Sequence, residues 1–398
     1  MKRLMVIITC LVLTLGAAQP AQAALPVEEG GLLVDGLAYE INADTQGGLW
    51  ISDWGSQTSN TGEVWQVNSS NGETVIYPIP GMPTDARRDG NYFWWVDGIA
   101  GVIGRAEVGA DGVTSVPYST WQTTASNGHY GSAVDAQGRL WATDALDNFI
   151  YRLNVIPGVN NDELCTYTIP NIGIVSYLAY GDPFLWIGDN LNGVLFRLNV
   201  TNNAVEWWTL PDLSSPNGMV VDAEGDLWYA DYILAEILEL DPDLNTVRRY
   251  PLPENHTTIM NAIESGRIWF TGDSPPMIGM IDPNTASFTS LPLSHNSDVW
   301  TPTCDSPVGP ATSGILDVST ATVQFQPTAE YPVDTLGPGL QIYAVPPDTT
   351  NDPPISARPW GIAYQNGKMW VVDSGRQTLI RIEPPPDLAM VFLPLILR

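Results

Sequence analysis

The chain has 398 residues, with 44 acidic side chains against 16 basic ones and a formal net charge of −28. This charge excludes a general nucleic-acid binder, because binding to phosphates relies on lysine and arginine side chains that displace counterions. Aromatic residues make up 10% of the chain, and 15 residues are tryptophan. That content can fill a large core, so a wholly disordered chain is excluded as well.

Residues 1–23 have the features of a bacterial secretory signal peptide. Lys2 and Arg3 precede an apolar stretch over residues 4–15, and Ala21-Gln22-Ala23 is typical of a cleavage site. The apolar stretch is shorter than a bilayer crossing requires, and no other stretch is long enough. We therefore expect a secreted or envelope-associated protein with no transmembrane segment.

Two cysteines, Cys165 and Cys304, remain after removal of this segment. An oxidising compartment would permit a disulfide between them, but two free buried thiols are equally compatible with the sequence. The spacing alone does not decide between these alternatives.

A strand pattern, an apolar residue followed by Trp-x-x-Asp, recurs along the chain. The first six copies start 41–47 residues apart, and the sixth contains one extra residue before its Asp. The copies are Trp50 to Asp53, Trp94 to Asp97, Trp141 to Asp144, Trp186 to Asp189, Trp228 to Asp231, Trp269 to Asp273 and Trp370 to Asp373. Self-similarity at this period is the signature of a repeat architecture.

The flanks of the pattern repeat too. A turn such as Asp135-Ala136-Gln137-Gly138 precedes the tryptophan strand, and the Asp can hydrogen-bond its own turn. A later strand ends in Leu-Pro, as at Leu252-Pro253, where an outer strand tolerates proline. Four short strands per repeat predict an all-β fold, a seven-bladed β-propeller of four-stranded antiparallel blades over residues 24–383. The tryptophans are expected to pack between blades.

Residues 298–350 lack the pattern and are rich in Pro, Thr, Asp and Gly. We predict an insertion between the sixth and the last blade, with a hairpin near Gln341–Ala344. Residues near 32–34 or the C-terminal tail are expected to close the ring. Residues 384–398 form a proline-rich spacer and an apolar tail, which is either an edge strand or a tag for sorting or surface retention.

Propellers bind ligands at one mouth of the central channel, where the first residues of the inner strands converge. Counting back from each tryptophan gives these start positions as Asp35, Thr84, Tyr130, Ser176, Asn217, Met260 or Asn261, and Trp360. They either line a ligand or are solvated residues of the mouth. The seven Asp residues at the ends of the tryptophan strands share this face and are expected to cap turns.

The chain has three histidines, His129, His256 and His295, and we predict that all lie in connections between blades on this same face. Each could be a base, a metal ligand or a solvated loop residue. His256 is the best catalytic candidate, because Glu254 is close in sequence.

The segment from Pro216 to Asp231, followed by Tyr250-Pro251-Leu252-Pro253, resembles the streptogramin (virginiamycin B) lyase family of propellers. The resemblance extends over almost the whole mature chain and implies seven blades. In that family it also implies magnesium-assisted opening of a cyclic depsipeptide ester, with a His base. The family's Pro-His-Gly/Ala positions read Asn217 and Trp360 here, so its catalytic residues do not transfer.

The same segment also resembles the SMP-30/gluconolactonase type of propeller, in which oxygen ligands hold a divalent ion in the channel. Asn217-Gly218 and Asp35-Gly36 match this pattern locally. By this resemblance Asn217 and Asp35 would bind Mg²⁺ or Ca²⁺, and Asp85 or Glu40 could supply a third oxygen.

Three functions remain open from the sequence. The first is a secreted, monomeric protein that binds a small molecule or glycan at the channel mouth, with Trp360 and Tyr130 stacking on the ligand. The second is a Mg²⁺- or Ca²⁺-dependent lyase or lactonase that acts on cyclic esters. The third is an interaction module of the cell envelope that uses residues 298–350 as its contact surface.

Overall fold

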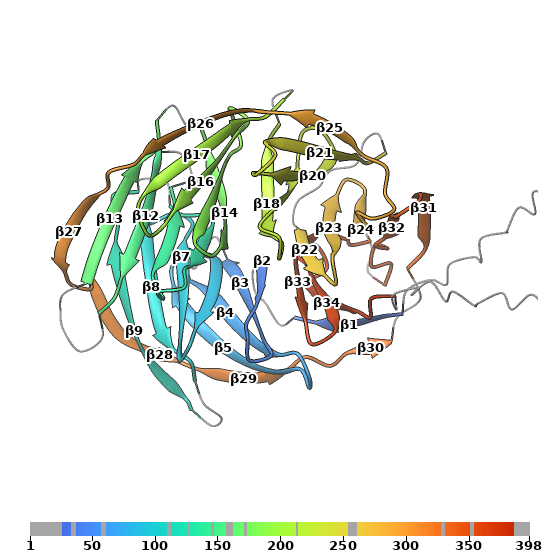
Figure 1. Cartoon of the computed structure of the whole chain (residues 1–398). Helices are drawn as coiled ribbons and strands as arrows, with labels where there is room; N and C mark the ends of the chain where they lie inside the picture. Colours follow the sequence, from blue (N-terminus) through green and yellow to red (C-terminus); the bar gives the residue numbers. More distant parts are fainter. Residues whose placement is uncertain are drawn as a thin grey trace, which may run out of the picture.

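Each Trp-x-x-Asp segment forms the second strand of its own antiparallel sheet, and seven such sheets are arranged around a central channel (Figure 1). The computed structural model describes residues 26–385 with gaps at 33–36, 57–60, 110–112, 126–127, 145–146, 157–161, 171–172, 212–213, 254–260, 328–330 and 351–353. The predicted seven-bladed propeller is confirmed, but each blade has five strands rather than four.

Five of the blades are built from four strands that are consecutive in the chain, the first strand lying innermost. The first blade comprises β2 (Ala38–Ala43), β3 (Gly48–Ser56), β4 (Thr61–Asn68) and β5 (Glu73–Pro80). The second comprises β6 (Pro83–Asp89), β7 (Tyr92–Asp97), β8 (Val102–Glu107) and β9 (Ser115–Gln122). The third comprises β10 (Ser132–Val134), β11 (Leu140–Thr143), β12 (Phe149–Asn154) and β13 (Asp162–Thr168).

The fourth and fifth blades follow the same plan, and the last two differ. The fourth comprises β14 (Val175–Gly181), β15 (Phe184–Asp189), β16 (Val194–Asn199) and β17 (Ala204–Thr209). The fifth comprises β18 (Pro216–Val221), β19 (Leu227–Asp231), β20 (Glu236–Asp241) and β21 (Thr246–Pro251). The sixth begins with β22 (Asn261–Glu264), β23 (Arg267–Asp273) and β24 (Pro276–Ile281), and the seventh with β33 (Pro359–Gln365), β34 (Lys368–Asp373) and β35 (Thr378–Ile382).

The recurring tryptophans pack between blades, where each is at most 3% exposed. Three of them are also fixed by the turn that precedes their strand. The indole Nε1 of Trp50, Trp141 and Trp228 donates to Asp44, Asp135 and Asp222, each at 2.8 Å. The same Asp135 carboxylate accepts the backbone N–H of Gln137 at 3.0 Å, so one carboxylate orders the turn and orients the indole.

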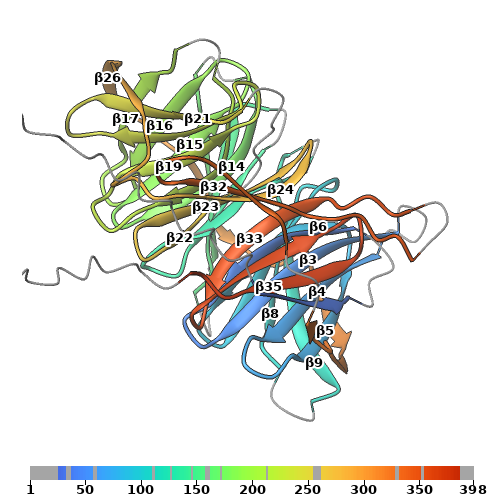
Figure 2. The same cartoon turned by 90° about the vertical axis from the view of Figure 1, so that its right-hand side faces the viewer.

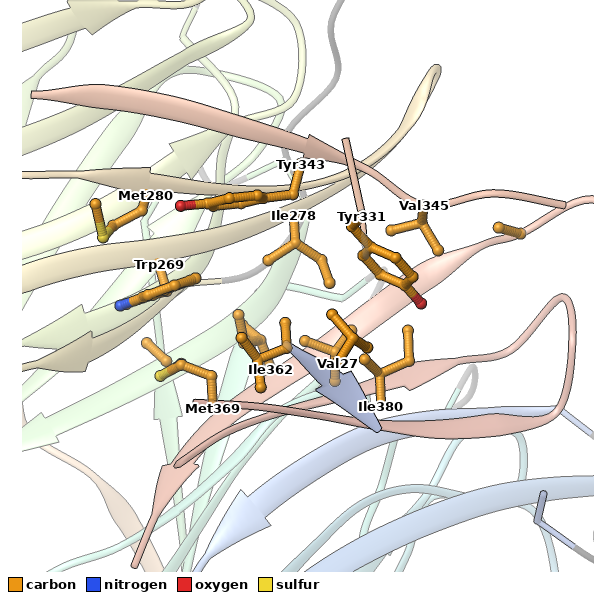
Figure 3. Close-up of a cluster of buried hydrophobic side chains, with 14 of the residues drawn as sticks. Val27, Trp269, Ile278, Met280, Tyr331, Tyr343, Val345, Ile362, Met369 and Ile380 are labelled. Atoms are coloured by element: carbon orange, nitrogen blue, oxygen red, sulfur yellow. The ribbon is translucent and has the colours of Figure 1, made fainter. Parts of the chain in front are cut away.

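The N-terminal strand β1 (Val27–Gly31) closes the ring by pairing with β35 of the seventh blade. The adjoining Leu32 N–H donates to the Gln377 carbonyl at 2.8 Å, so the predicted closure by residues near 32–34 begins slightly earlier in the chain. In the core between the sixth and seventh blades, Val27 lies beside Ile362 and Ile380 (Figure 3). Closure therefore joins the two ends of the described chain in one blade.

The extra strand of six blades comes from one continuous segment, residues 289–327, which we call the belt. Its strands are β25 (Thr289–Pro292), β26 (Ser294–Val299), β27 (Thr303–Val308), β28 (Thr312–Asp317), β29 (Ser319–Thr322) and β30 (Gln326–Pro327). They pair in turn with the outer strands of the fifth, fourth, third, second, first and seventh blades. The belt thus runs around the rim against the order of the blades (Figure 1), and β26 lies at the outer edge in the view of Figure 2.

The belt leaves the sixth blade after its third strand and returns as its outer hairpin. This hairpin consists of β31 (Val333–Gly337) and β32 (Leu340–Ala344), which confirms the hairpin predicted near Gln341–Ala344. The belt is therefore inserted within the sixth blade, between its third strand and its outer hairpin. The sequence had predicted an insertion between the sixth and the last blade. The belt strands escaped prediction because most of their side chains are exposed, which removes the apolar alternation of a half-buried strand.

Apolar side chains and one covalent bond attach the belt to the blades. Trp300, Leu316 and Val323 are buried in three different clusters between blades. Cys304 on β27 forms a disulfide with Cys165 on β13, with 4.0 Å between their Cα atoms. Of the two alternatives for these cysteines, the structure thus contains the disulfide.

The predicted signal segment and the apolar tail beyond Pro385 lie outside the described residues. The described residues contain no helix with the length and apolar character that a membrane crossing requires.

Candidate functional site

The Asp residues at the ends of the second strands hold turns together within their own blades. Asp97 accepts the backbone N–H of Met82, which leads into the inner strand, at 2.7 Å, and that of Ile99 in the following turn at 2.8 Å. Asp231 does the same with Ser215 at 3.0 Å and Ile233 at 2.9 Å. All but the sixth of these seven Asp residues are buried. Their carboxylates are therefore committed to the fold, as the capping interpretation predicted.

The predicted start positions have different environments. Thr84 is fully buried and donates to the His129 carbonyl at 2.7 Å, which joins the second blade to the third. Asn217 is half-buried and accepts from Asn190 Nδ2 at 3.2 Å. Ser176 lies on β14, but its side chain is outside the described set, as is the whole of Asp35.

Strand register identifies Tyr39 as the first-blade residue that corresponds to Asn217. Ala38 pairs with Asp53 as Pro216 pairs with Asp231, so the next residue in each blade occupies the same place. Both inner strands then have a register shift, which re-aims the following side chains. The sequence signal was present, since Tyr39 lies as far before Trp50 as Asn217 lies before Trp228.

Four aromatic side chains gather at this face, and we call them the aromatic mouth: Tyr39, Trp54, Tyr130 and Trp360. The Tyr39 ring centroid lies 4.9 Å from that of Trp54 and 5.1 Å from that of Trp360. Tyr130 approaches Trp54 edge-on at 6.2 Å. All four are half-buried, so the first, third and seventh blades jointly present aromatic surface at the mouth. Two of the four, Tyr130 and Trp360, were predicted ligand-binding residues.

Tyr39 faces a tyrosine from the opposite side of the channel. Its side chain lies close to that of Tyr177 on β14 of the fourth blade. Burial is the main cause that raises the pKa of Tyr39 to about 12. Burial also raises the pKa of Tyr177, so both tyrosines are neutral at physiological pH.

Farther along the inner strands, the channel contains a cavity of about 330 Å³, which we call the channel pocket. Its wall is formed by inner-strand residues of six blades. The lining residues used below are Glu40, Asn42, Arg87, Tyr177, Tyr180, Met219, Ile362 and Tyr364. None of Trp54, Tyr130 and Trp360 lines it, so the channel pocket and the aromatic mouth are distinct places in one channel.

A polar network joins three blades at the side of the channel pocket. Asp85, fully buried on β6, accepts the Ser132 N–H at 2.8 Å and the Ser132 hydroxyl at 2.7 Å. It also accepts Asn42 Nδ2 at 2.7 Å and Arg87 Nε at 3.1 Å. Burial, followed by the adjacent Asp85, raises the pKa of Glu40 well above its usual value, while Arg87 opposes the rise.

The described histidines, His129 and His295, do not line the channel pocket. His129 is fully buried, with Nε2 3.0 Å from the Thr123 hydroxyl and Nδ1 bonded to the Thr143 carbonyl. His295 lies on the belt, 3.3 Å from Glu206, so the prediction that it shares the ligand face is wrong. His256, the catalytic candidate, is outside the described residues.

His129 is expected to make the fold sensitive to acid. Burial lowers its pKa from 6.5 to about 4, so the folded protein excludes a proton that the unfolded chain binds. Stability is then lost as the pH falls below the unfolded value, by about 2 kcal/mol between roughly pH 7 and pH 5. Denaturant unfolding at both pH values tests this. A His129→Gln variant should lose that part of the difference, whereas His295→Gln should keep it; an unchanged difference in His129→Gln would contradict the assignment.

The oxygen ligands implied by the gluconolactonase resemblance are not assembled in the described residues. The Asn217 side-chain oxygen is bonded to Asn190, and its partner Asp35 is not described. The one described group of His, Cys, Asp or Glu side chains within ligating distance is Glu163, Cys165 and Cys304, whose sulfurs form the disulfide. A divalent ion at Asn217 and Asp35 therefore stays a prediction.

Proteins similar to this chain are known both from sequence and from solved structures. A virginiamycin B lyase of Nocardia farcinica (strain IFM 10152) is 25% identical over 224 residues, which cover 56% of this chain and 72% of the lyase. The solved virginiamycin B lyase of Staphylococcus aureus has a TM-score of 0.63 and 17% identity, over 90% of this chain and 99% of its own. A solved streptogramin B lyase has a TM-score of 0.61 and 17% identity, over 90% of this chain and 97% of its own. The chain is a streptogramin lyase-like β-propeller.

No family profile matches the chain. Among the solved relatives, a histidine-to-alanine variant of the staphylococcal lyase, described as catalytically inactive, was determined with quinupristin; it too has a TM-score of 0.63 and 17% identity, over 90% of this chain and 99% of its own. At this identity the solved lyases show the fold of this chain and not its chemistry.

Proposed function

We propose that this streptogramin lyase-like propeller is a secreted protein that binds a small molecule or glycan at the aromatic mouth without transforming it. The observation that supports this proposal is a chain of four half-buried aromatic rings from three blades at the channel mouth, in which neighbouring ring centroids lie 4.9–6.2 Å apart. Such rings stack on the apolar faces of sugars and aromatic molecules at little entropic cost. The disulfide supports export, because disulfides persist in oxidising compartments.

Binding without catalysis follows from the groups near the mouth. Each of the six buried Asp carboxylates accepts at least one backbone N–H, and His129 is buried with both ring nitrogens occupied. Trp360 stands where the lyase pattern has histidine. Among the described residues, the mouth is thus rich in stacking surface and poor in groups that could remove a proton.

Trp360→Ala is expected to weaken ligand binding about tenfold, because truncating a stacking aromatic commonly costs more than 1 kcal/mol of binding energy. The measurement is tryptophan fluorescence during titration with a panel of oligosaccharides and aromatic small molecules. Phe288→Ala is the matched control, since Phe288 is an exposed aromatic at the rim, packed on Tyr250. Equal affinities of wild type and Trp360→Ala for every bound probe would refute the proposed mouth.

The second candidate is lyase activity on a cyclic ester, and the identity to the Nocardia lyase favours it. His256 would then act as the base, with Mg²⁺ or Ca²⁺ at Asn217 and Asp35. Incubation with quinupristin and Mg²⁺, with and without EDTA, tests this by mass spectrometry of the opened ring. Turnover that is lost in both His256→Ala and Asn217→Ala would establish the enzyme, and no turnover by the wild-type protein would reject it.

A further inference from the structure

The channel pocket contains a carboxylate oxygen without a hydrogen-bond partner. Glu40 is 8% exposed, and its Oε2 atom is buried without a donor within the described part of the chain. Its Oε1 atom lies 3.8 Å from the nearest nitrogen of Arg87, which is too far for a hydrogen bond. A buried carboxylate without donors is costly, so a donor that the fold does not provide would be bound at this point.

The surrounding groups do not compensate Glu40. Asp85 already accepts from Arg87, Asn42 and both polar groups of Ser132. The guanidinium of Arg87 thus lies near two carboxyl groups, and it is hydrogen-bonded to Asp85 and not to Glu40. When Glu40 is ionised, the uncompensated negative charge at the channel pocket lies on its carboxylate.

The rest of the channel pocket is suited to an organic body. Tyr177, Tyr180 and Tyr364 supply aromatic wall, and Met219 and Ile362 supply aliphatic wall. A cavity of about 330 Å³ is at the lower end of the size range for small-molecule sites. A bare metal ion would leave these apolar walls unfilled.

We propose that the channel pocket binds a small organic amine, whose ammonium group pairs with Glu40 while its apolar or aromatic body contacts the tyrosine and aliphatic walls. An ammonium group is compact and carries three donors, which matches a carboxylate that lacks them. An anionic ligand would instead face two carboxyl groups. This site is additional to the aromatic mouth and does not depend on the function proposed there.

Amine binding should release a proton and weaken at low pH. The ionisable groups that face Glu40 are Tyr39 on its own strand, Asp85 and Arg87 on β6, and Tyr177 on β14. Burial raises the pKa of Glu40, so part of the free protein holds the neutral acid, whereas the ammonium ion selects the carboxylate. The affinity therefore falls as the pH drops through the raised pKa of Glu40.

The test is calorimetric titration and thermal unfolding of the mature protein with three probes of one shape: phenethylamine, 2-phenylethanol and 3-phenylpropionate. We expect binding and a raised Tm with the amine alone, and proton uptake by the buffer on binding. Glu40→Gln should weaken amine binding roughly tenfold or more, because a charge-assisted hydrogen bond is lost. Glutamine keeps the shape and removes a buried charge, and the Tm of the free variant checks that the fold is retained.

Phe288→Ala is the control, since Phe288 is an exposed aromatic residue that does not line the channel pocket. It should bind phenethylamine as the wild type does, and because Glu40→Gln leaves the aromatic mouth intact, the failure of one proposal does not decide the other. The proposal is overturned if no probe binds, if the alcohol or the carboxylate binds as well as the amine, or if Glu40→Gln keeps the amine affinity.

Discussion

Trp141→Ala is expected to lower the free energy of unfolding by about 3–5 kcal/mol. The side chain is fully buried between the third and fourth blades, and its ring centroid lies 5.2 Å from that of Tyr167. Its removal leaves a cavity and deprives the buried Asp135 of one donor, at 2.8 Å in the wild type. Denaturant unfolding of wild type and variant gives the difference directly.

Trp141→Phe separates the two contributions. Phenylalanine fills most of the space but cannot donate to Asp135, so the expected loss is smaller, about 1–3 kcal/mol. Trp269→Phe is the matched control, because the Nε1 atom of Trp269 has no hydrogen-bond partner in the described residues. If the two phenylalanine variants were equally destabilised, the turn carboxylate would contribute nothing measurable to holding the indole.

Cys304→Ser is expected to destabilise the protein by about 2–5 kcal/mol, because the disulfide closes a chain loop with a sequence separation of 139 residues. A long loop removes much conformational freedom from the unfolded chain. The measurement is the Tm of wild type and variant, each with and without a reductant. The reductant should lower the Tm of the wild type and leave that of the variant unchanged.

Limited proteolysis locates the effect in the belt. Without the disulfide, cleavage should become faster within residues 294–308, where the side chains on both strands are mostly exposed and Cys304 forms the covalent attachment. Cleavage that accelerated equally throughout the blades would instead show that the bond stabilises the whole ring and does not fasten the belt in particular.

The blades could be predicted from sequence because the residues that mark them act locally. Asp231 and Trp228 each make their contacts with turns of their own blade or with the adjoining blade, so the same pair recurs wherever a blade recurs. The start of the first inner strand was predicted at Asp35, four residues before Tyr39, although Tyr39 has the same spacing before Trp50 that Asn217 has before Trp228.

The belt and the channel pocket depend on contacts that no local pattern encodes. Each belt strand pairs with a blade that is distant in sequence, and its exposed side chains lack strand alternation. Glu40 and Asp85 were considered only as metal oxygens, whereas in the structure Asp85 is saturated with donors and Glu40 is left with a free oxygen. That difference depends on the neighbouring strands and not on the residue types.

The course of the belt also bears on how the molecule behaves at high concentration. A propeller without it would expose one long unpaired strand border per blade, and such borders invite association with other chains. In six blades these borders are occupied by belt strands of two to six residues, rich in polar side chains. What is left for another chain to pair with is short and interrupted, so the rim of the propeller offers little strand edge for association with other chains.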